Sequence, residues 1–304
     1  MVGQETPPTA IPREILEAVR RIEIRARRLV DETFSGEYHS VFRGRGVAFR
    51  EVREYVPGDD VRSIDWNVTA RTGHPFVKVF DEERELTVML VADVSRSGRF
   101  GTGPRDKAEI VAELCGVLAL AAVTNRDKVG LVLFSDQVEL FIPPARGRGH
   151  VLRVIRELLA ARPVGRGTDL NAPLRMLGSV VKRRATVFLV SDFWTPDFAT
   201  SLRVVTRRHD CVAVRVRDPR ETGMAPAGLV RWVDAETGET RLVDTDRERT
   251  RREAAARAAA HDAGLERLLF RLGVDLVEVD ATRSYVIPLQ AFFARRQRRL
   301  RRGP

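Results

Sequence analysis

The sequence predicts an α/β protein with a mostly parallel central sheet, one antiparallel edge strand and helices on both faces. From residue 86 onward, short apolar runs alternate with longer amphipathic segments, which is the order of strands and helices in such sheets. The apolar runs are unbroken, as in strands that are buried on both faces. Only residues 135–137 separate the runs at 128–134 and 138–142, so this pair predicts a hairpin and the antiparallel edge.

The N-terminal residues have a different character. Residues 1–12 contain several prolines and predict a disordered terminus. Residues 13–31 place apolar side chains at helical spacing and predict an amphipathic helix dense in arginine. Residues 34–80 are rich in glycine, proline and aspartate, with short alternating pieces, and predict a small β or irregular module. We therefore expect the helix and the module to form an N-terminal domain at 13–85.

Residues 86–283 predict the α/β domain itself. Strands are expected at apolar runs and helices where apolar positions recur every three to four residues. In chain order these are a strand at 87–92, a helix with a long apolar face at 105–124, strands at 128–134 and 138–142, helices at 149–161 and 169–182, a strand at 185–190, a helix at 197–208, a strand at 211–216, a long Ala/Arg helix at 248–272 and a strand at 274–279.

Two segments stand outside this alternation. Several glycines and a proline interrupt it at 218–246, where residues 229–233 and 240–243 predict a β-hairpin insertion. Residues 284–304 predict a closing basic helix and tail.

The chain of 304 residues has a formal net charge of +10, most of it from arginine. Arginine and glutamate alternate along most of the expected helices, so we interpret the charge as dispersed rather than as a nucleic-acid surface. The exception is the arginine-rich run at 295–302. This run could contact an acidic partner, RNA or a lipid surface, or it could be a solvated helix end.

The sequence predicts neither a membrane span nor a secretory leader. No apolar run approaches the roughly 20 residues that cross a bilayer, and residues 1–5 lack the basic and apolar blocks of a signal peptide. Cys115 and Cys211 have no CxxC neighbour and no nearby histidine pair, which predicts buried free thiols. We expect a cytoplasmic protein.

The most informative motif follows the strand at 87–92. Asp93, Ser95 and Ser97 leave the sheet together at the carboxyl end of that strand, which is the edge where ligands bind in open α/β sheets. Their ligating atoms are all oxygen, which suits a hard cation such as Mg²⁺ or Mn²⁺.

Two further loops add oxygen ligands at the same edge. Thr168 lies in a glycine-containing loop before a helix, which Asp169 is expected to cap, and Asp192 follows the strand at 185–190. We therefore predict that two carboxylates and three hydroxyls meet at one edge of the sheet.

These five residues, Asp93, Ser95, Ser97, Thr168 and Asp192, resemble the metal-ion-dependent adhesion site of von Willebrand factor A domains. The resemblance implies a Rossmann-like von Willebrand factor A fold for the α/β domain. It also implies that the hydroxyls lie in or near the coordination shell and that the aspartates act largely through water. One coordination position stays open for the carboxylate of a partner protein. Gly98 follows Ser97, where many such domains carry a serine and a methionine.

A second resemblance covers most of the chain. Segments 40–46, 53–67 and 70–71 are similar to the signature of a bacterial domain-of-unknown-function family. Its members carry a von Willebrand factor A-like domain and are typically encoded beside MoxR-type AAA+ ATPases. The resemblance implies a non-enzymatic, Mg²⁺-binding adaptor that works with such an ATPase in chaperone-like remodelling or maturation of client proteins. A client would supply the acidic residue that completes the metal shell.

The segment Tyr55 to Asn67 allows two interpretations. Its aspartates and arginine could form a buried salt-bridge network that holds the small module, with Trp66 as the packing anchor. Alternatively, the segment could be the docking face for the ATPase. We favour the scaffold.

Two other function classes remain open. Asp93 could be the nucleophile of a Mg²⁺-dependent phosphotransferase or phosphatase, but Ser95 stands where such enzymes carry a second carboxylate, and only Arg166 is available to neutralise a phosphoryl group. The arginine-rich end could bind nucleic acid, but no aromatic platform accompanies it. No GxxxxGK[ST] segment occurs, so we expect no nucleotide hydrolysis by this chain.

Overall fold

The computed structural model describes residues 12–34, 38, 41, 48–81, 86–99, 106–223, 225–234, 236 and 238–302. By their contacts the residues divide into a large unit, 1–41 and 87–304, and a small unit, 42–86. Apart from Pro12, the N-terminus that we expect to be disordered lies outside the described residues.

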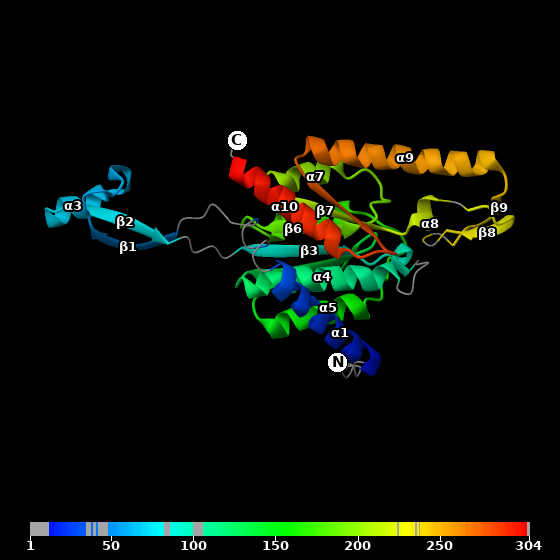
Figure 1. The fold of residues 1–304 in the computed structure, drawn as a ribbon, viewed down its shortest axis with the longest axis horizontal. Coiled ribbons are helices and arrows are strands. Elements are labelled where there is room, and N and C mark those ends of the chain that lie inside the picture. The colour runs from blue at the N-terminus through cyan, green and yellow to red at the C-terminus, as the bar shows by residue number, and fades with distance from the viewer. Residues whose placement is uncertain are drawn as a thin grey trace, which may run out of the picture. The chain divides into compact units, whose positions relative to one another are not determined.

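The large unit is built on a six-stranded sheet with the order β10-β7-β6-β3-β4-β5 (Figure 1). Its strands are β3 (Thr87–Asp93), β4 (Lys128–Phe134), β5 (Val138–Ala145), β6 (Thr186–Ser191), β7 (Asp210–Arg217) and β10 (Asp275–Asp280). All neighbours are parallel except β4 and β5, which form an antiparallel hairpin at the edge. The predicted mostly parallel sheet with one antiparallel edge strand is confirmed.

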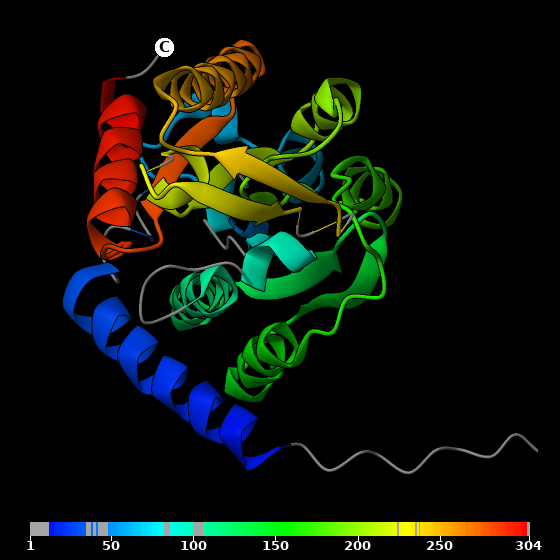
Figure 2. The same ribbon diagram turned by 90° about the vertical axis from the view of Figure 1, so that its right-hand side faces the viewer.

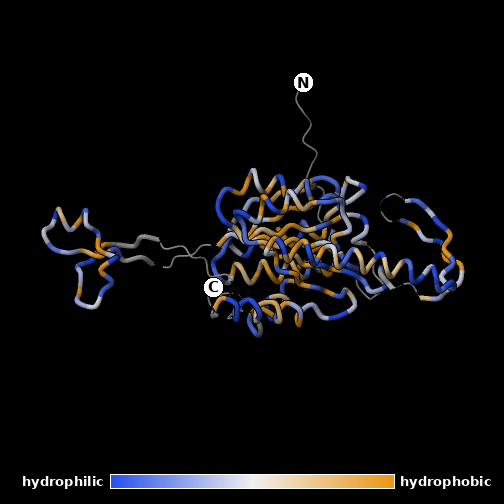
Figure 3. The backbone as a smooth tube through the Cα atoms, turned by 90° about the horizontal axis from the view of Figure 1, so that it is seen from above, coloured by the Kyte–Doolittle hydropathy of each residue, from blue (hydrophilic) through white to orange (hydrophobic). Residues whose placement is uncertain are grey.

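Helices cover both faces of this sheet, as predicted (Figure 2). Side chains of α6 (Asn171–Val180), α7 (Ala199–Thr206) and α9 (Glu248–Arg271) share one buried core with Met89 and Val91 of β3. Residues on the opposite side of the same strands face α4 and α5. The most apolar segments are accordingly the central strands and the helices beside them (Figure 3).

Two layers of helix cover the second face. α4 (Lys107–Thr124) and α5 (Arg148–Ala160) lie against the sheet, and α1 (Arg13–Leu29) packs on both. α4 is buried on nearly all sides, which explains its apolar sequence all around the helix. A Cβ at Gly116 would lie 2.8 Å from the Ile22 side chain, so this glycine allows the close approach of α1.

By these contacts α1 and its π-helical extension η1 (Val30–Phe34) belong with the large unit. We had expected residues 13–31 to form one domain with the small module.

Three elements complete the large unit. The short helix α8 (Pro219–Thr222) precedes the hairpin of β8 (Leu229–Val233) and β9 (Thr240–Asp244), which pair in antiparallel register as predicted. α10 (Val286–Arg302) packs beside β10. Two arginines of α10 form ion pairs with aspartates at the start of β7 and β10 rather than a free basic surface, namely Arg296 with Asp210 and Asp275, and Arg299 with Asp275. No helix among the described residues is long and apolar enough to cross a membrane.

The small unit is a two-stranded sheet with short helices. β1 (Ala48–Glu54) and β2 (Phe76–Asp81) are antiparallel, and η2 (Val61–Ser63) and α3 (Trp66–Thr72) lie between them in the chain. Asp65 caps α3 by accepting hydrogen bonds from the backbone N–H groups of Asn67 and Val68.

The expected packing role of Trp66 is wrong, because 67% of this residue is exposed. Trp66 is the first residue of α3, and the preceding Asp65 forms an ion pair with Lys78 of β2 at 3.5 Å. Asp59 also lies at the surface, where Arg53 donates two hydrogen bonds to its carboxylate. Among the described residues, the segment is therefore held by local caps, by the surface pair Arg53–Asp59 and by the pair of Lys78 with the buried Asp65, rather than by a connected network of buried salt bridges.

Candidate metal site

The centre of the site is Asp93, the last residue of β3. Its Oδ1 accepts a hydrogen bond from the backbone N–H of Ser95 at 2.9 Å. Its Oδ2 accepts one from the hydroxyl of Ser191 at 2.6 Å, and Ser191 is the last residue of the neighbouring strand β6. Asp93 is therefore held by groups from two adjacent parallel strands at their carboxyl ends.

The two serines of the motif lie beside this carboxylate. Ser95 is buried, and its Oγ lies 3.0 Å from the Oγ of Ser97, in the short helix η3 (Arg96–Arg99). The hydroxyl of Ser97 in turn donates to Oδ2 of Asp192 at 3.4 Å. Asp93, Ser95, Ser97 and Asp192 are thus brought together from two loops, as the sequence analysis predicts.

Thr168 lies in a third loop and is linked to the group through Glu236, whose carboxylate interacts electrostatically with Asp192. The side chain of Thr168 is buried, and its hydroxyl donates to Oε1 of Glu236 at 2.5 Å. Thr195 positions the Thr168 backbone by donating its hydroxyl to the Thr168 carbonyl at 3.1 Å. Glu236 lies in the turn of the β8–β9 hairpin, and Figure 2 shows this hairpin lying across the carboxyl edge of the sheet.

The turn between β4 and β5 holds the loop that carries Thr168. Oδ2 of Asp136 accepts hydrogen bonds from the N–H groups of Arg166 and Gly167, both at 3.2 Å. Oε1 of Glu139 accepts from the N–H groups of Val164 and Gly165, at 3.0 and 2.8 Å. The hydrogen bonds that Asp136 accepts, first that from Gly167 and then that from Arg166, hold the pKa of Asp136 below its ordinary value. Oδ1 of Asp169 accepts from the N–H of Asn171 at 2.8 Å, but the N-cap residue of α6 is Leu170, so Asp169 does not hold the capping position that we expected.

Lys107 is a further charged group at the site that the sequence analysis missed. Its ammonium is buried and donates to Oδ2 of Asp192 at 2.9 Å and to Oε1 of Glu221 at 2.5 Å. Burial lowers the pKa of Lys107, but the two carboxylates more than offset this, and the pKa lies above its ordinary value. The signal in the sequence is a lysine in the first turn of an apolar helix, where the helix dipole disfavours a cation unless carboxylates are near.

Carboxylates outnumber ammonium groups among the described residues of the site. The ammonium of Lys107 pairs with Asp192 and Glu221, and the carboxylates of Asp93 and Glu236 interact electrostatically with Asp192. Burial and the charge of Asp192 raise the pKa of Asp93 to about 6. Burial also raises the pKa of Glu221 and of Glu236, and the charge of Asp192 adds to both shifts.

This arrangement fits a small divalent cation. Its oxygen atoms come from carboxylates and hydroxyls, which are the ligands that Mg²⁺ and Mn²⁺ prefer, and a cation would relieve the excess of negative charge. Within the described part of the chain, no three His, Cys, Asp or Glu side chains are arranged as a metal-binding group. A cation here would therefore depend on the hydroxyls of Ser95, Ser97 and Thr168, with Asp93 and Asp192 as the carboxylates.

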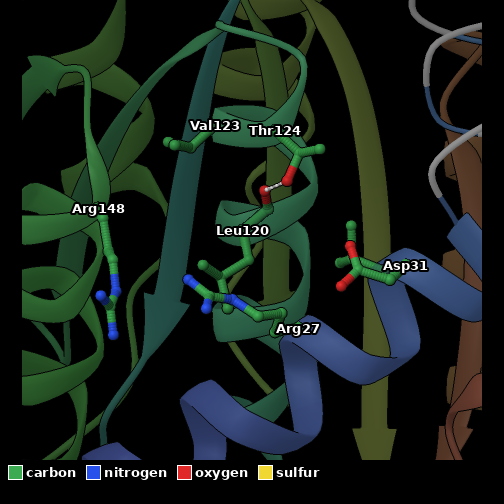
Figure 4. Close-up of a pocket in the computed structure, with 7 residues that line it drawn as sticks. Arg27, Asp31, Leu120, Val123, Thr124 and Arg148 are labelled. Carbon is green, nitrogen blue, oxygen red and sulfur yellow. Dashed lines mark hydrogen bonds between the residues drawn. The ribbon is translucent and has the colours of Figure 1, made fainter.

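A small pocket lies elsewhere, between α1, α4 and α5 (Figure 4). Its lining includes Arg27, Leu120, Thr124 and Arg148. The hydroxyl of Thr124 donates to the carbonyl of Leu120 at 2.9 Å, and Arg148 forms an ion pair with Glu23. These polar groups already have partners within the helices, so we assign the pocket no function.

Comparison with protein families gives one match to this chain. The model of the family described as "Protein of unknown function DUF58" matches residues 51–264. Among individual proteins, the chain is 30% identical to the "Uncharacterized protein Rv1480" of Mycobacterium tuberculosis over 288 residues, which is 94% of this chain and 90% of the relative.

Solved structures also resemble part of this chain. BatB from Bacteroides thetaiotaomicron, described as a conserved hypothetical protein, is 13% identical with a TM-score of 0.45, covering 70% of this chain and 100% of BatB. The VWA domain of SpRpn10 is 12% identical with a TM-score of 0.38, covering 67% of this chain and 92% of that domain.

Proposed function

The chain belongs to the DUF58 family, and from this membership and the geometry of the sheet edge we propose that it is a non-enzymatic, Mg²⁺-binding adaptor. The cation would be held by the carboxylates and hydroxyls of Asp93, Ser95, Ser97, Thr168 and Asp192. An acidic side chain of a client would complete its shell. The adaptor would act in the cytoplasm with a MoxR-type AAA+ ATPase in remodelling or maturing that client.

The convergence of Asp93, Ser97 and Asp192 is the observation that supports this proposal most. Ser97 is within hydrogen-bond distance of Asp192, although the two are 95 positions apart in the chain. Helix caps and loop turns use hydroxyls that are local in the chain, so they do not explain why Ser97 meets Asp192 from a different loop. A hydroxyl-rich shell also leaves the cation under-neutralised, so it still attracts an external anion.

Lys107 provides the main rival explanation. Its ammonium already pairs with Asp192 and Glu221, and a buried ion pair of this kind can serve structure alone. Among the described residues, four carboxylates share this edge with the ammonium of Lys107, and burial together with the charge of Asp192 raises the pKa of Asp93, Glu221 and Glu236. An additional cation would relieve this repulsion, which favours a metal site over a purely structural network.

Titration calorimetry with MgCl₂ or MnCl₂ tests the metal site. We expect wild type to bind the ion and Asp93→Asn to lose most of the heat, because the variant keeps its shape but not its charge. Asp197→Asn is the matched control, since Asp197 lies in the loop after the same strand β6 and accepts a hydrogen bond from the N–H of Ala199 instead of from a site residue. Equal heats from wild type and Asp93→Asn would exclude the cation site.

The partner needs a separate experiment. The full chain is used as bait in a pull-down with Mg²⁺ or with EDTA, and the retained proteins are identified by mass spectrometry. We expect an AAA+ ATPase that is retained with Mg²⁺ and released by EDTA. If the ATPase is retained equally with EDTA and by the Asp93→Asn variant, its binding does not depend on the metal site.

A further inference from the structure

Glu236 is an acidic side chain of this chain's own that reaches the candidate metal site. Its Oε1 accepts a hydrogen bond from the hydroxyl of Thr168 at 2.5 Å. Its other oxygen, Oε2, lies 3.6 Å from where a Cβ on Gly167 would stand, so the carboxylate is seated against the backbone of the Thr168 loop. A hydroxyl can donate its proton to a carboxylate and still offer a lone pair to a cation.

The described strands of the hairpin that bears Glu236 are largely exposed to solvent. Along β8 and β9 most side chains are exposed, including the apolar residues Leu229, Trp232 and Leu242. The base of the hairpin is tied by Thr245 and Asp246, which bond the backbone of Ala227 and Gly228. With few buried apolar contacts, such an element opens at low free energy.

We propose that Glu236 is an internal ligand that occupies the coordination position to which the acidic side chain of a client binds. The β8–β9 hairpin would then be an intramolecular competitor, and a client would bind by displacing it. This inference rests on the proposed metal site and adds a residue that the five-residue motif does not contain.

Charge and placement both support this assignment. Glu236 adds a carboxylate that interacts with Asp192, in a group where the ammonium of Lys107 already pairs with Asp192 and Glu221, so a further cation would offset the added repulsion. The backbone N–H of Glu236 donates to Oδ1 of Asp234 at 2.9 Å, so a local turn directs the residue toward Thr168. Glu236 thus places a carboxylate beside the hydroxyl of Thr168. A partner protein would place its own acidic side chain at an adhesion-type site in the same way.

The test uses Mn²⁺ and the proton relaxation of its bound water in the full-length protein. Glu236→Gln keeps the size of the side chain and an acceptor for Thr168 but removes the charge. We expect Mn²⁺ affinity to fall by roughly 10-fold or more, and the bound ion to gain one exchangeable water. Glu239→Gln is the matched control, because Glu239 lies on the same hairpin and pairs with the exposed Arg241.

Acetate serves as the probe for an external carboxylate. It should reduce the water relaxation of the Glu236→Gln complex at a lower concentration than that of wild type or of Glu239→Gln. If wild type binds no Mn²⁺, the proposed metal site fails and this inference fails with it. If wild type binds Mn²⁺ but Glu236→Gln shows the same affinity, hydration and acetate response, only the role of Glu236 is overturned.

Discussion

The hydroxyl of Ser191 donates a 2.6 Å hydrogen bond to Asp93, which joins the carboxyl ends of two neighbouring parallel strands at the base of the candidate metal site. Ser191 also accepts a hydrogen bond from the N–H of Phe193 at 3.0 Å. Phe193 has a φ of 62°, which is unfavourable for a residue with a side chain. One buried hydroxyl therefore holds both the central carboxylate and a strained turn.

Removing this hydroxyl should destabilise the protein. In Ser191→Ala, Asp93 loses a donor and Phe193 an acceptor, and we expect the free energy of unfolding to fall by about 1–3 kcal/mol. Denaturant titration measures this change. Ser179→Ala, at an exposed position of α6, should stay within about 0.5 kcal/mol of wild type; an equal effect of both variants would contradict the role of Ser191.

The stability of the metal-free protein should depend on pH through Asp93. Its pKa is about 6 in the fold against an ordinary value of 3.8, so the folded state binds the proton more tightly. Below pH 4 the protonated Asp93 contributes its whole stabilisation of the fold, about 3 kcal/mol. This contribution is lost as the pH rises through 6. We expect unfolding titrations between pH 4 and 7 in EDTA to show this trend in wild type and to show a smaller slope in Asp93→Asn. Matching slopes would argue against a raised pKa.

Lys107 should be essential when no divalent cation is present. Lys107→Met leaves Asp192 and Glu221 without their buried cation, which is expected to reduce the free energy of unfolding by about 3–5 kcal/mol. The exposed Lys182→Met is the control, with little change expected. Thermal unfolding with and without Mg²⁺ compares the two, and Mg²⁺ should recover more stability in Lys107→Met than in wild type.

Gly165 should not tolerate a side chain. A Cβ at this position would collide with the carboxylate of Asp136 and the hydroxyl of Ser135, the groups that anchor the Thr168 loop. We expect Gly165→Ala to destabilise the protein by about 1–3 kcal/mol and to weaken Mn²⁺ binding. Gly178→Ala, in α6 with open space around it, should instead be neutral or stabilising by up to about 1 kcal/mol. Calorimetric unfolding of both variants separates steric conflict from helix propensity.

The two cysteines should be inert in the native protein. Both thiols are buried and free, and burial raises the pKa of Cys115 and of Cys211 to about 12. Because the thiolate is the reactive form, a chromogenic disulfide reagent at pH 8 should label them slowly in buffer and rapidly in guanidinium chloride. Rapid labelling of the folded protein would show that one of these sites opens readily.

Much of the fold follows from local pattern. The unbroken apolar runs predicted β3, β4 and β6 nearly to the residue, and the short link after β4 predicted the antiparallel edge. The role assigned to Trp66 was wrong, because residue type alone does not say which way the first side chain of a short helix points.

The sequence by itself determined which strand ends carry oxygen ligands, because a parallel sheet brings the carboxyl ends of β3 and β6 to one edge whatever the helices do. Only the tertiary structure decided which other charges share that edge. Lys107 meets Asp192 and Glu221, and Glu236 meets Thr168, across 85, 114 and 68 positions of the chain. Such contacts depend on how a helix and a hairpin fold back over the sheet, and no spacing within a motif encodes them.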